Sequence, residues 1–138
     1  MTVTEPARHL AVKVVMMPRD TNPMGTIFGG VILSYIDQAG AVGALYEGAK
    51  QGWPQRVLVT VAMNAVEFHQ PVFVGDVVSF WTEVKKVGRT SITVYVSVEC
   101  ERGGGTVKLT GAVVTYVAID PFSPVRKTLP IRGEINDQ

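Results

Sequence analysis

Hydrophobic and polar residues alternate with a period of two across the segment 90–101. Apolar side chains occupy the even positions from Ile92 to Cys100, and mostly polar ones occupy the odd positions from Ser91 to Glu99. This pattern is typical of a β-strand with one buried face. Comparable runs bounded by Pro, Gly and Asp predict further strands over 9–17, 56–68, 77–87 and 106–119, and "RGGG" at 102–105 predicts a hairpin turn between the last two strands.

A different pattern fills the segment 27–48, where apolar residues leave almost no polar face. This predicts a long helix that a sheet buries nearly all round. Gly40 and Gly43 lower the helix propensity of the segment, so they indicate that another element packs closely there. Asp37 lies in the middle of the helix, where a carboxylate is costly unless it is hydrogen-bonded or used in chemistry.

The predicted order is one strand, one long helix and four strands joined by short turns. Antiparallel strands with one helix on a single face make an α+β domain. A chain of 138 residues suits one domain, so we expect a single domain over 1–138, with a flexible N-terminus at 1–8 and an irregular tail at 120–138.

Composition narrows the range of partners. The net charge of +1 predicts neither a nucleic-acid stripe nor a membrane-binding face. No run reaches the length of a membrane span, and the N-terminus does not resemble a signal peptide, so a cytoplasmic location is expected. A single cysteine excludes an intrachain disulfide and is consistent with a reducing compartment. The hydrophobic content of 46% indicates a buried interface between subunits.

Asp37 and the glycines before it are the main candidates for chemistry. Asp37 either caps a neighbouring loop or serves as a general base or nucleophile. Gly30 precedes it by seven residues, which places both on one helical face two turns apart, with Ser34 between them. Gly29 and Gly30 either permit the turn into the helix or expose backbone N–H groups to a reacting oxygen.

Other polar residues have simpler interpretations. Asn22 in "DTNP" is an ordinary turn former, and His69 at a strand end is more often structural than catalytic. Cys100 falls on the apolar face of its strand and is expected in the core. One cysteine and two distant histidines do not make a zinc cluster, so no metal and no cofactor is expected.

The turn "VGRTS" combines Gly88, Arg89, Thr90 and Ser91. It is either a hairpin turn with a solvated charge or a group of phosphate ligands, because guanidinium and hydroxyl groups bind phosphate well. Arg126 in the tail could take part in the same way.

The stretch "DTNPMGTIFGGVILSYIDQAG" closely resembles the signature of the hotdog-fold acyl-CoA thioesterases, in the cytosolic acyl-CoA hydrolase branch. The matching positions are Asn22, Gly25, Gly29, Gly30, Asp37, Ala39 and Gly40. Further likeness in "EFHQPVFVGDVVSFWTEVKKVGRTSITVYVSVE" and "VVTYVAIDP" extends the resemblance over roughly residues 10–130. It implies a hotdog fold, in which an antiparallel sheet of about five strands wraps around the central helix.

The resemblance also implies a function, hydrolysis of fatty acyl-CoA to a free fatty acid and coenzyme A. Asp37 would be the base or nucleophile, a helix-start N–H would bind the oxyanion, and Asn22 would face Asp37 of another subunit. The 88–91 turn and Arg126 would meet the nucleotide of coenzyme A. The implied assembly is a homodimer, often three dimers in a hexamer.

Alternatives remain at this level: a hotdog enoyl-CoA hydratase or dehydratase, or a non-catalytic acyl-CoA-binding module. Acyl-chain length, pathway, the base or nucleophile role of Asp37 and the identity of the donating N–H stay open.

Overall fold

The computed structural model describes residues 7–133, so most of the N-terminal segment predicted to be flexible, and the last part of the tail, lie outside the described residues. In chain order the elements are β1 (His9–Val15), the short 3-10 helix η1 (Pro18–Asp20), α1 (Gly29–Gln51), β2 (Val57–Phe68), β3 (Val77–Val87), β4 (Ser91–Arg102) and β5 (Gly105–Ile119).

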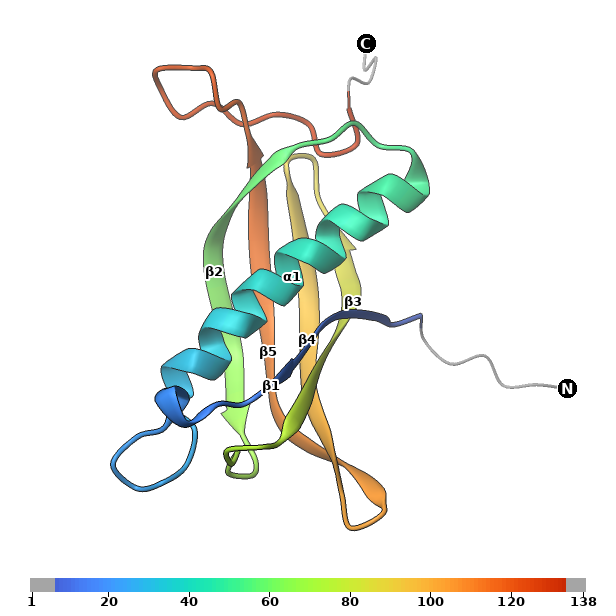
Figure 1. Ribbon diagram of the computed structural model, residues 1–138. Helices are drawn as coiled ribbons and strands as arrows, with labels where there is room; N and C mark the ends of the chain where they lie inside the picture. The colour runs from blue at the N-terminus through green and yellow to red at the C-terminus, as the bar shows by residue number, and fades with distance from the viewer. Residues whose placement is uncertain (1–6, 134–138) are drawn as a thin grey trace, which may run out of the picture.

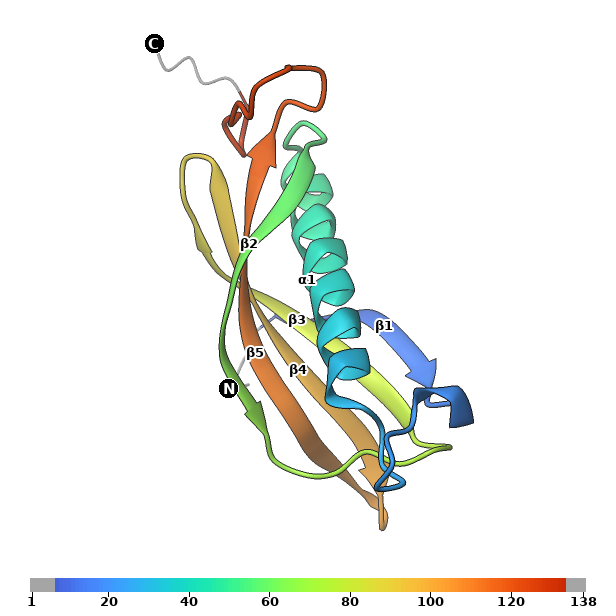
Figure 2. The ribbon, with the colours of Figure 1, turned by 90° about the vertical axis from the view of Figure 1, so that its left-hand side faces the viewer.

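The five strands form one antiparallel sheet in the order β1-β3-β4-β5-β2. The sheet curves, and α1 lies across its concave face (Figures 1 and 2). The helix packs most extensively against β3, β4 and β1, so it sits toward that side of the sheet, and β2 forms the opposite edge. The predicted α+β hotdog architecture is therefore confirmed.

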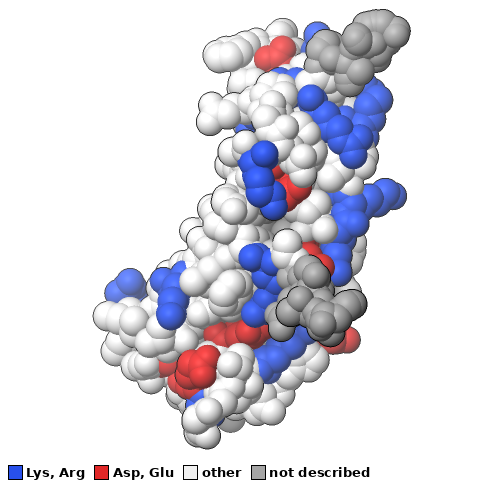
Figure 3. All heavy atoms as spheres, turned by 90° about the vertical axis from the view of Figure 1, so that its right-hand side faces the viewer, with Lys and Arg blue, Asp and Glu red and all other residues white. Residues whose placement is uncertain are grey.

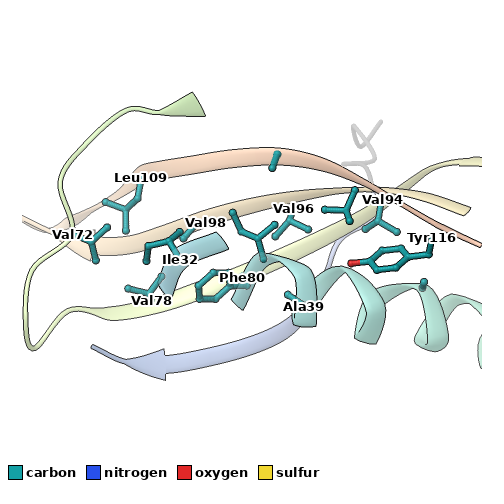
Figure 4. Close-up of a cluster of buried hydrophobic side chains, with 14 of the residues drawn as sticks. Ile32, Ala39, Val72, Val78, Phe80, Val94, Val96, Val98, Leu109 and Tyr116 are labelled. Atoms are coloured by element: carbon teal, nitrogen blue, oxygen red, sulfur yellow. The ribbon is translucent and has the colours of Figure 1, made fainter. Parts of the chain in front are cut away.

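The core lies between α1 and the concave face of the sheet (Figure 4). The helix contributes Ile32, Ile36 and Ala39, and the alternating positions of β4 contribute Val94, Val96 and Val98, all fully buried. The period-two pattern thus selected the correct face of β4. The most deeply buried large side chains of the core are Tyr116, Phe80, Met16, Ile32, Ile36, Ile92 and Leu109.

The helix begins two residues later than its apolar pattern predicts. The Ile27 N–H donates to the Val72 carbonyl oxygen at 2.7 Å, and the Phe28 N–H donates to the Asp20 carbonyl oxygen at 2.8 Å. These tertiary hydrogen bonds hold the backbone extended, with Phe28 at ψ 132 as the N-cap. The helix then ends at Gln51, because Gly52 adopts a left-handed conformation at φ +77 and its N–H caps the last turn.

Close packing at the two central helix glycines is confirmed. A Cβ added at Gly40 would lie 2.2 Å from the Tyr116 hydroxyl oxygen, and one added at Gly43 would lie 2.3 Å from the Thr82 Oγ1. Only glycine lets these two sheet side chains reach the helix backbone.

The expectation that the sheet buries the helix nearly all round is wrong for this chain. Val42, Leu45 and Tyr46 keep 40–46% of their surface exposed on the outer side of α1. The reason is that the curved sheet covers only one side of the helix (Figure 2). The apolar outer residues are therefore available to another surface, and we call Val42, Leu45 and Tyr46 the open face of α1.

The tail is more ordered than its composition predicts. Ile119 forms an isolated antiparallel bridge with Thr128, and Ile131 is 5% exposed. The Ile131 N–H donates to the Arg89 carbonyl oxygen at 2.8 Å, which ties the tail to the β3–β4 turn. Residues 120–133 are irregular, as expected, but they close the end of the molecule at which α1 finishes (Figure 1).

Candidate active site

Asp37 lies on the flank of α1 that faces the edge strand β2, rather than inside the sealed core. Its side chain is partly exposed, and its Oδ1 accepts a hydrogen bond of 2.6 Å from the Thr60 hydroxyl. The carboxylate is therefore bonded to a side chain from a distant element and not to a local loop. One oxygen is held by Thr60, which leaves lone pairs of the carboxylate for another partner.

The backbone around Asp37 is fixed from the core side. The Tyr116 hydroxyl donates to the Asp37 carbonyl oxygen at 2.7 Å, in the space that Gly40 leaves open. In Figure 4 the ring of Tyr116 lies against α1 with its hydroxyl toward the helix. Burial raises the pKa of the Tyr116 phenol above its usual value, and the charge of Asp37 adds to this shift. Tyr116 therefore remains a neutral donor that holds this turn of the helix.

Strand β2 is irregular beside the residue that contacts Asp37. Its pairing with β5 is regular up to Thr60 and shifts between Thr60 and Ala62, which is a β-bulge at the residue after the Asp37 contact. Bulges re-aim side chains and are common beside active sites. A second irregularity lies between Asn64 and Glu67, where Ala65 has φ +53. The outer edge of β2 pairs with no other strand among residues 7–133.

Gly29 and Gly30 form the first turn of α1. The N-cap residue Phe28 gives no side-chain hydrogen bond, and the first N–H groups of a helix have no acceptor within the helix. Each glycine borders a different hollow. Gly29 lines a cleft of about 240 Å³ together with Phe68 and His69, and Gly30 lines an open hollow of about 420 Å³ on the outer side of the helix.

The side chain of Asn22 is engaged in its own loop. Its Oδ1 accepts from the Met24 N–H at 2.9 Å and from the Thr26 N–H at 3.2 Å, while its Nδ2 donates to the Thr26 hydroxyl at 3.0 Å. These bonds match the turn-forming interpretation and shape the loop that leads into α1. A role for Asn22 toward a substrate stays a prediction.

Asp37 and the helix-start N–H groups of the same chain are far apart. Seven residues separate Gly30 from Asp37, which corresponds to about 10 Å along the helix axis. The N–H groups also point out of the helix start, away from Asp37, so an oxygen bound there would lie further still. One chain therefore does not bring these two groups to a single reacting atom.

The β3–β4 turn lies at the opposite end of the molecule from the helix start (Figure 1). The Gly88 N–H donates to the Ser91 carbonyl oxygen at 2.8 Å, and a Cβ at Gly88 would lie 2.7 Å from the Ser91 Oγ, so a larger residue there would have to displace the Ser91 hydroxyl. The side chain of Arg89 is exposed, and Thr90 is joined to β5 through the Ala118 N–H. Arg126, also exposed, follows in the tail at this end.

The remaining candidates can be placed briefly. Cys100 is buried, as predicted, and burial raises the pKa of its thiol. His69 is about half exposed in the cleft beside Gly29, with its Nε2 3.6 Å from the Glu67 carboxylate. Within residues 7–133, no group of three or more His, Cys, Asp and Glu side chains could hold a metal ion. No helix in that range is long and apolar enough to cross a membrane.

Sequence reasoning missed Thr60. It lies 23 residues from Asp37 in β2, and nothing local distinguishes its hydroxyl from that of any exposed strand threonine. The available signal was indirect. A polar residue on the helix-facing side of a strand is unusual, and here the helix that it faces carries a carboxylate.

Comparisons with known proteins identify a family. Residues 24–107 match the model of the thioesterase superfamily. The chain is 38% identical to the acyl-CoA thioester hydrolase YciA of Salmonella typhimurium, over 93% of this chain and 95% of that protein. Its fold is similar to a hexameric hotdog thioesterase, Cj0915 of Campylobacter jejuni, with a TM-score of 0.74 and 42% identity over 88% of this chain and 89% of that one.

A second structural relative is HI0827, described as a hexameric broad specificity acyl-coenzyme A thioesterase. The TM-score is 0.75 and the identity is 34%, covering 98% of this chain and 87% of the other.

Proposed function

Since this chain belongs to the thioesterase superfamily, we propose that it hydrolyses acyl-CoA thioesters at a site built from Asp37 of one subunit and the helix start of another. The activity itself follows from the relatives: the chain is an acyl-CoA thioester hydrolase of the same type as YciA and HI0827. This favours hydrolysis over hydration of an enoyl-CoA and over non-catalytic binding. The arrangement of the catalytic groups is the part that we propose.

The observation that carries the proposal is the pair formed by Asp37 and Thr60. A carboxylate fixed by a hydroxyl at 2.6 Å, partly open to solvent and beside an unpaired strand edge, can accept a proton or attack a carbonyl carbon. The reacting carbonyl must lie about 3 Å from the attacking oxygen and from the oxyanion donors. The helix start of the same chain is too far from Asp37 to satisfy both, so a second copy supplies the donors.

The edge strand β2 is the surface through which the second copy would join. Val57, Val61 and Phe68 keep 45–53% of their surface exposed along this edge, and Leu45 of the open face lines the same cavity as Leu58 of β2. An exposed edge with apolar side chains favours pairing with another strand. Two copies related by a twofold axis would join β2 to β2 and cover the open face of both helices.

This pairing would bring Asp37 and the helix start of the second copy together. In the chain, β2 runs antiparallel to α1, and the midpoint of β2 lies two to three residues, roughly 8 Å, beyond Thr60 toward the helix start. A twofold axis through that midpoint would place Asp37 of one copy beside the other copy's helix. The point that it faces lies roughly 15 Å nearer the start of that helix than the second copy's own Asp37. The start of α1 lies about 10–12 Å from Asp37 along the helix, within about one helical turn of that level, so Gly29 and Gly30 of one copy would approach Asp37 of the other.

The reaction follows from these positions. The thioester carbonyl oxygen accepts a hydrogen bond from an N–H at the start of the partner helix, where the helix dipole also favours negative charge. As a base, Asp37 takes a proton from the attacking water and returns it to the coenzyme A thiolate when the carbon–sulfur bond breaks, which releases the fatty acid and the thiol. As a nucleophile, Asp37 attacks the carbonyl carbon and displaces the thiolate, which takes a proton from water; a second water then hydrolyses the mixed anhydride, releases the fatty acid and restores Asp37. Thr60 keeps the carboxylate in position throughout.

The nucleotide of coenzyme A would lie at the end where α1 finishes. The β3–β4 turn offers the Arg89 side chain and the Thr90 and Ser91 hydroxyls, and Arg126 lies in the adjoining tail. Figure 3 displays Lys and Arg side chains along this face of the molecule, interrupted by Asp and Glu, and several lie toward that end. Guanidinium groups suit the phosphates of coenzyme A.

A hexamer of three such dimers is the assembly that we propose. Its support is the hexameric state of Cj0915 and HI0827, together with the exposed apolar surface of the single chain. The mass in solution, measured by light scattering, tests it directly.

The experiment for the proposed chemistry replaces Asp37 by Asn, which keeps the shape of the side chain and removes its basicity. Turnover of acyl-CoA, followed as release of free thiol, should fall by roughly a hundredfold or more, the usual contribution of a general base. The circular dichroism spectrum and the mass in solution should not change. Wild-type turnover in a correctly assembled Asp37→Asn enzyme would refute the role of Asp37.

A further inference from the structure

A small apolar cavity lies between the second half of α1 and the residues that close that end of the molecule. Its volume is about 100 Å³. Its walls include Ala44, Leu45 and Gly48 of α1, Leu58 of β2, Trp53 of the connecting loop and Ile131 of the tail. The volume is somewhat below that of the roughly 150 Å³ apolar cavity that accepts benzene in a well-studied case.

Two elements lead from the proposed catalytic pair into this cavity. Along α1, Asp37, Ala41, Ala44 and Gly48 follow one another at helical spacing on one flank, and the last two line the cavity. Along β2, Leu58 lies two residues from Thr60 and therefore on the same side of the strand. The cavity thus lies along the same flank of α1 that carries Asp37, and the helix residue between them on this flank, Ala41, has a small side chain.

Apart from Gln55 and Arg56, the residues that line the cavity are apolar, so its walls suit a hydrocarbon better than a polar group. The one guanidinium among the lining residues is that of Arg56, and its Nε donates to the Pro130 carbonyl oxygen at 2.9 Å. This bond holds the tail against the loop, and the Arg132 guanidinium lies 5.8 Å from the centre of the Trp53 ring. A pantetheine arm carries two amides that would lose their hydrogen bonds here, whereas methylene groups would lose nothing.

We infer that this cavity receives the far end of the acyl chain of the substrate, and that Gly48 and Trp53 limit the chain length that the enzyme accepts. The inference rests on the proposed function, because it takes Asp37 as the point at which the thioester is cleaved. The acyl chain and the pantetheine arm leave that point in opposite directions, so the nucleotide would meet the β3–β4 turn of another copy and not the turn beside this cavity. Gly48 lies 11 residues beyond Asp37, about 16 Å along the helix. Short acyl groups therefore do not reach the cavity, and only long ones occupy it.

The test fills the cavity by one substitution. A Cβ at Gly48 would lie 3.5 Å from the Trp53 Cε3, an ordinary contact, so Gly48→Ala fits and Gly48→Leu places its branched end in the cavity. The matched control is Gln51→Leu, which adds the same side chain to the same end of the helix on an exposed position that does not line the cavity. The values of kcat/KM are measured for a series from acetyl-CoA to hexadecanoyl-CoA.

For the longest substrates, Gly48→Leu should lower kcat/KM by roughly tenfold or more, which is the discrimination that a filled hydrophobic pocket provides. Acetyl-CoA and butyryl-CoA should be hydrolysed as by the wild type, and Gln51→Leu should leave the whole series unchanged. Gly48→Ala should give a smaller loss of kcat/KM at the same chain lengths, so the test can still be interpreted if leucine disturbs the fold.

Two results would overturn the inference. In one, Gly48→Leu hydrolyses long and short substrates as the wild type does. In the other, it loses the same factor on every substrate, acetyl-CoA included, which would assign the cavity to the coenzyme A part. Both results leave thioester hydrolysis intact, whereas a wild-type protein that releases no thiol from any acyl-CoA would count against the proposed function itself.

Discussion

At the scale of single residues, the account depends on how Asp37 is held. A carboxylate on an apolar helix is stable here because its flank faces solvent and a hydroxyl, not the core. The hydroxyl belongs to Thr60 of the edge strand β2, and the Tyr116 hydroxyl holds the backbone carbonyl oxygen of Asp37. The two bonds restrain both the side chain and the backbone, which is the preorganisation that a catalytic group needs.

Thr60 should therefore be a positioning residue for Asp37. Thr60→Val keeps the shape of the side chain and removes the hydrogen bond, and a bond to a charged group contributes about 1.5–3 kcal/mol. We expect kcat to fall by roughly 10- to 100-fold with little change in KM.

Thr60→Ser restores a hydroxyl and should recover much of the lost kcat. If Thr60 had only a structural role, Thr60→Ser would be no more active than Thr60→Val, or the substitutions would change kcat and KM by the same factor. Equal kcat for wild type and Thr60→Val would remove Thr60 from the mechanism.

Arg89 should act on the nucleotide and not on the chemistry. Arg89→Ala should raise the KM for acyl-CoA by roughly tenfold and leave kcat unchanged, because a charge-assisted bond to phosphate is lost. The increase should shrink in high salt, which screens exposed charges.

The matched substrate is an acyl thioester of N-acetylcysteamine, which lacks the nucleotide. Wild type and Arg89→Ala should hydrolyse it equally well. A defect of the same size on this truncated substrate would show that Arg89 does not contact phosphate.

At the scale of elements, the position of α1 on the sheet is set by its glycines. Gly40 admits the Tyr116 hydroxyl and Gly43 admits Thr82, whereas Gly48 has only ordinary neighbours at 3.5 Å and beyond. One helix thus contains glycines that close packing requires and one that it does not. The difference predicts opposite responses to the same substitution.

Gly40→Ala should lower the free energy of unfolding by about 1–3 kcal/mol, the cost of overpacking a well-filled site. Gly48→Ala should raise it by about 0.5–1 kcal/mol, because alanine is the better helix former. Urea titrations followed by circular dichroism measure both. If Gly40→Ala were as stable as the wild type, the close contact with Tyr116 would not determine where the helix sits.

Much of the fold could be predicted from the sequence, because the decisive patterns are local. The alternation from Ile92 to Cys100 identifies both strand and buried face, and the bounds 77–87 of β3 are confirmed. The apolar pattern predicts a start of α1 that is two residues too early, since nothing in the sequence indicates that the Ile27 N–H bonds to the Val72 carbonyl oxygen. Tertiary hydrogen bonds of this kind decide element ends.

The candidate site is less accessible from sequence, because it depends on contacts across the fold. Asp37 and the helix-start glycines could be found by spacing and resemblance. The Thr60 contact could not, because it spans 23 residues and depends on how the curved sheet meets the helix. The burial of Ile131 was also unforeseen, since it packs against a turn far away in the chain.

At the scale of the whole molecule, three features of the single chain call for a second copy. The open face of α1 is apolar and exposed, β2 has an unpaired outer edge among the described strands, and the helix-start donors lie too far from Asp37. A twofold pairing through β2 would cover the apolar face, pair the free strand edge and bring the donors of one copy toward Asp37 of the other. The same pairing would make each active site a product of two chains, so an isolated chain would be inactive.

The most direct test of this central claim is complementation between two inactive variants. One is Asp37→Asn, and the other is Gly29→Pro, which removes the first helix N–H at a position where proline is tolerated and where Phe28 already has the extended conformation that precedes proline. Gly29→Ala, which keeps the N–H, is the control, and Gly30→Pro replaces Gly29→Pro if Gly30 is the donor.

The thiol-release activity of dimers that contain one chain of each variant is the decisive measurement. In a composite site, every mixed dimer holds one intact site, from Asp37 of one chain and the helix start of the other, so activity should return well above that of either variant alone. Mixed dimers as inactive as both parents would contradict the account and place the whole reaction within a single chain.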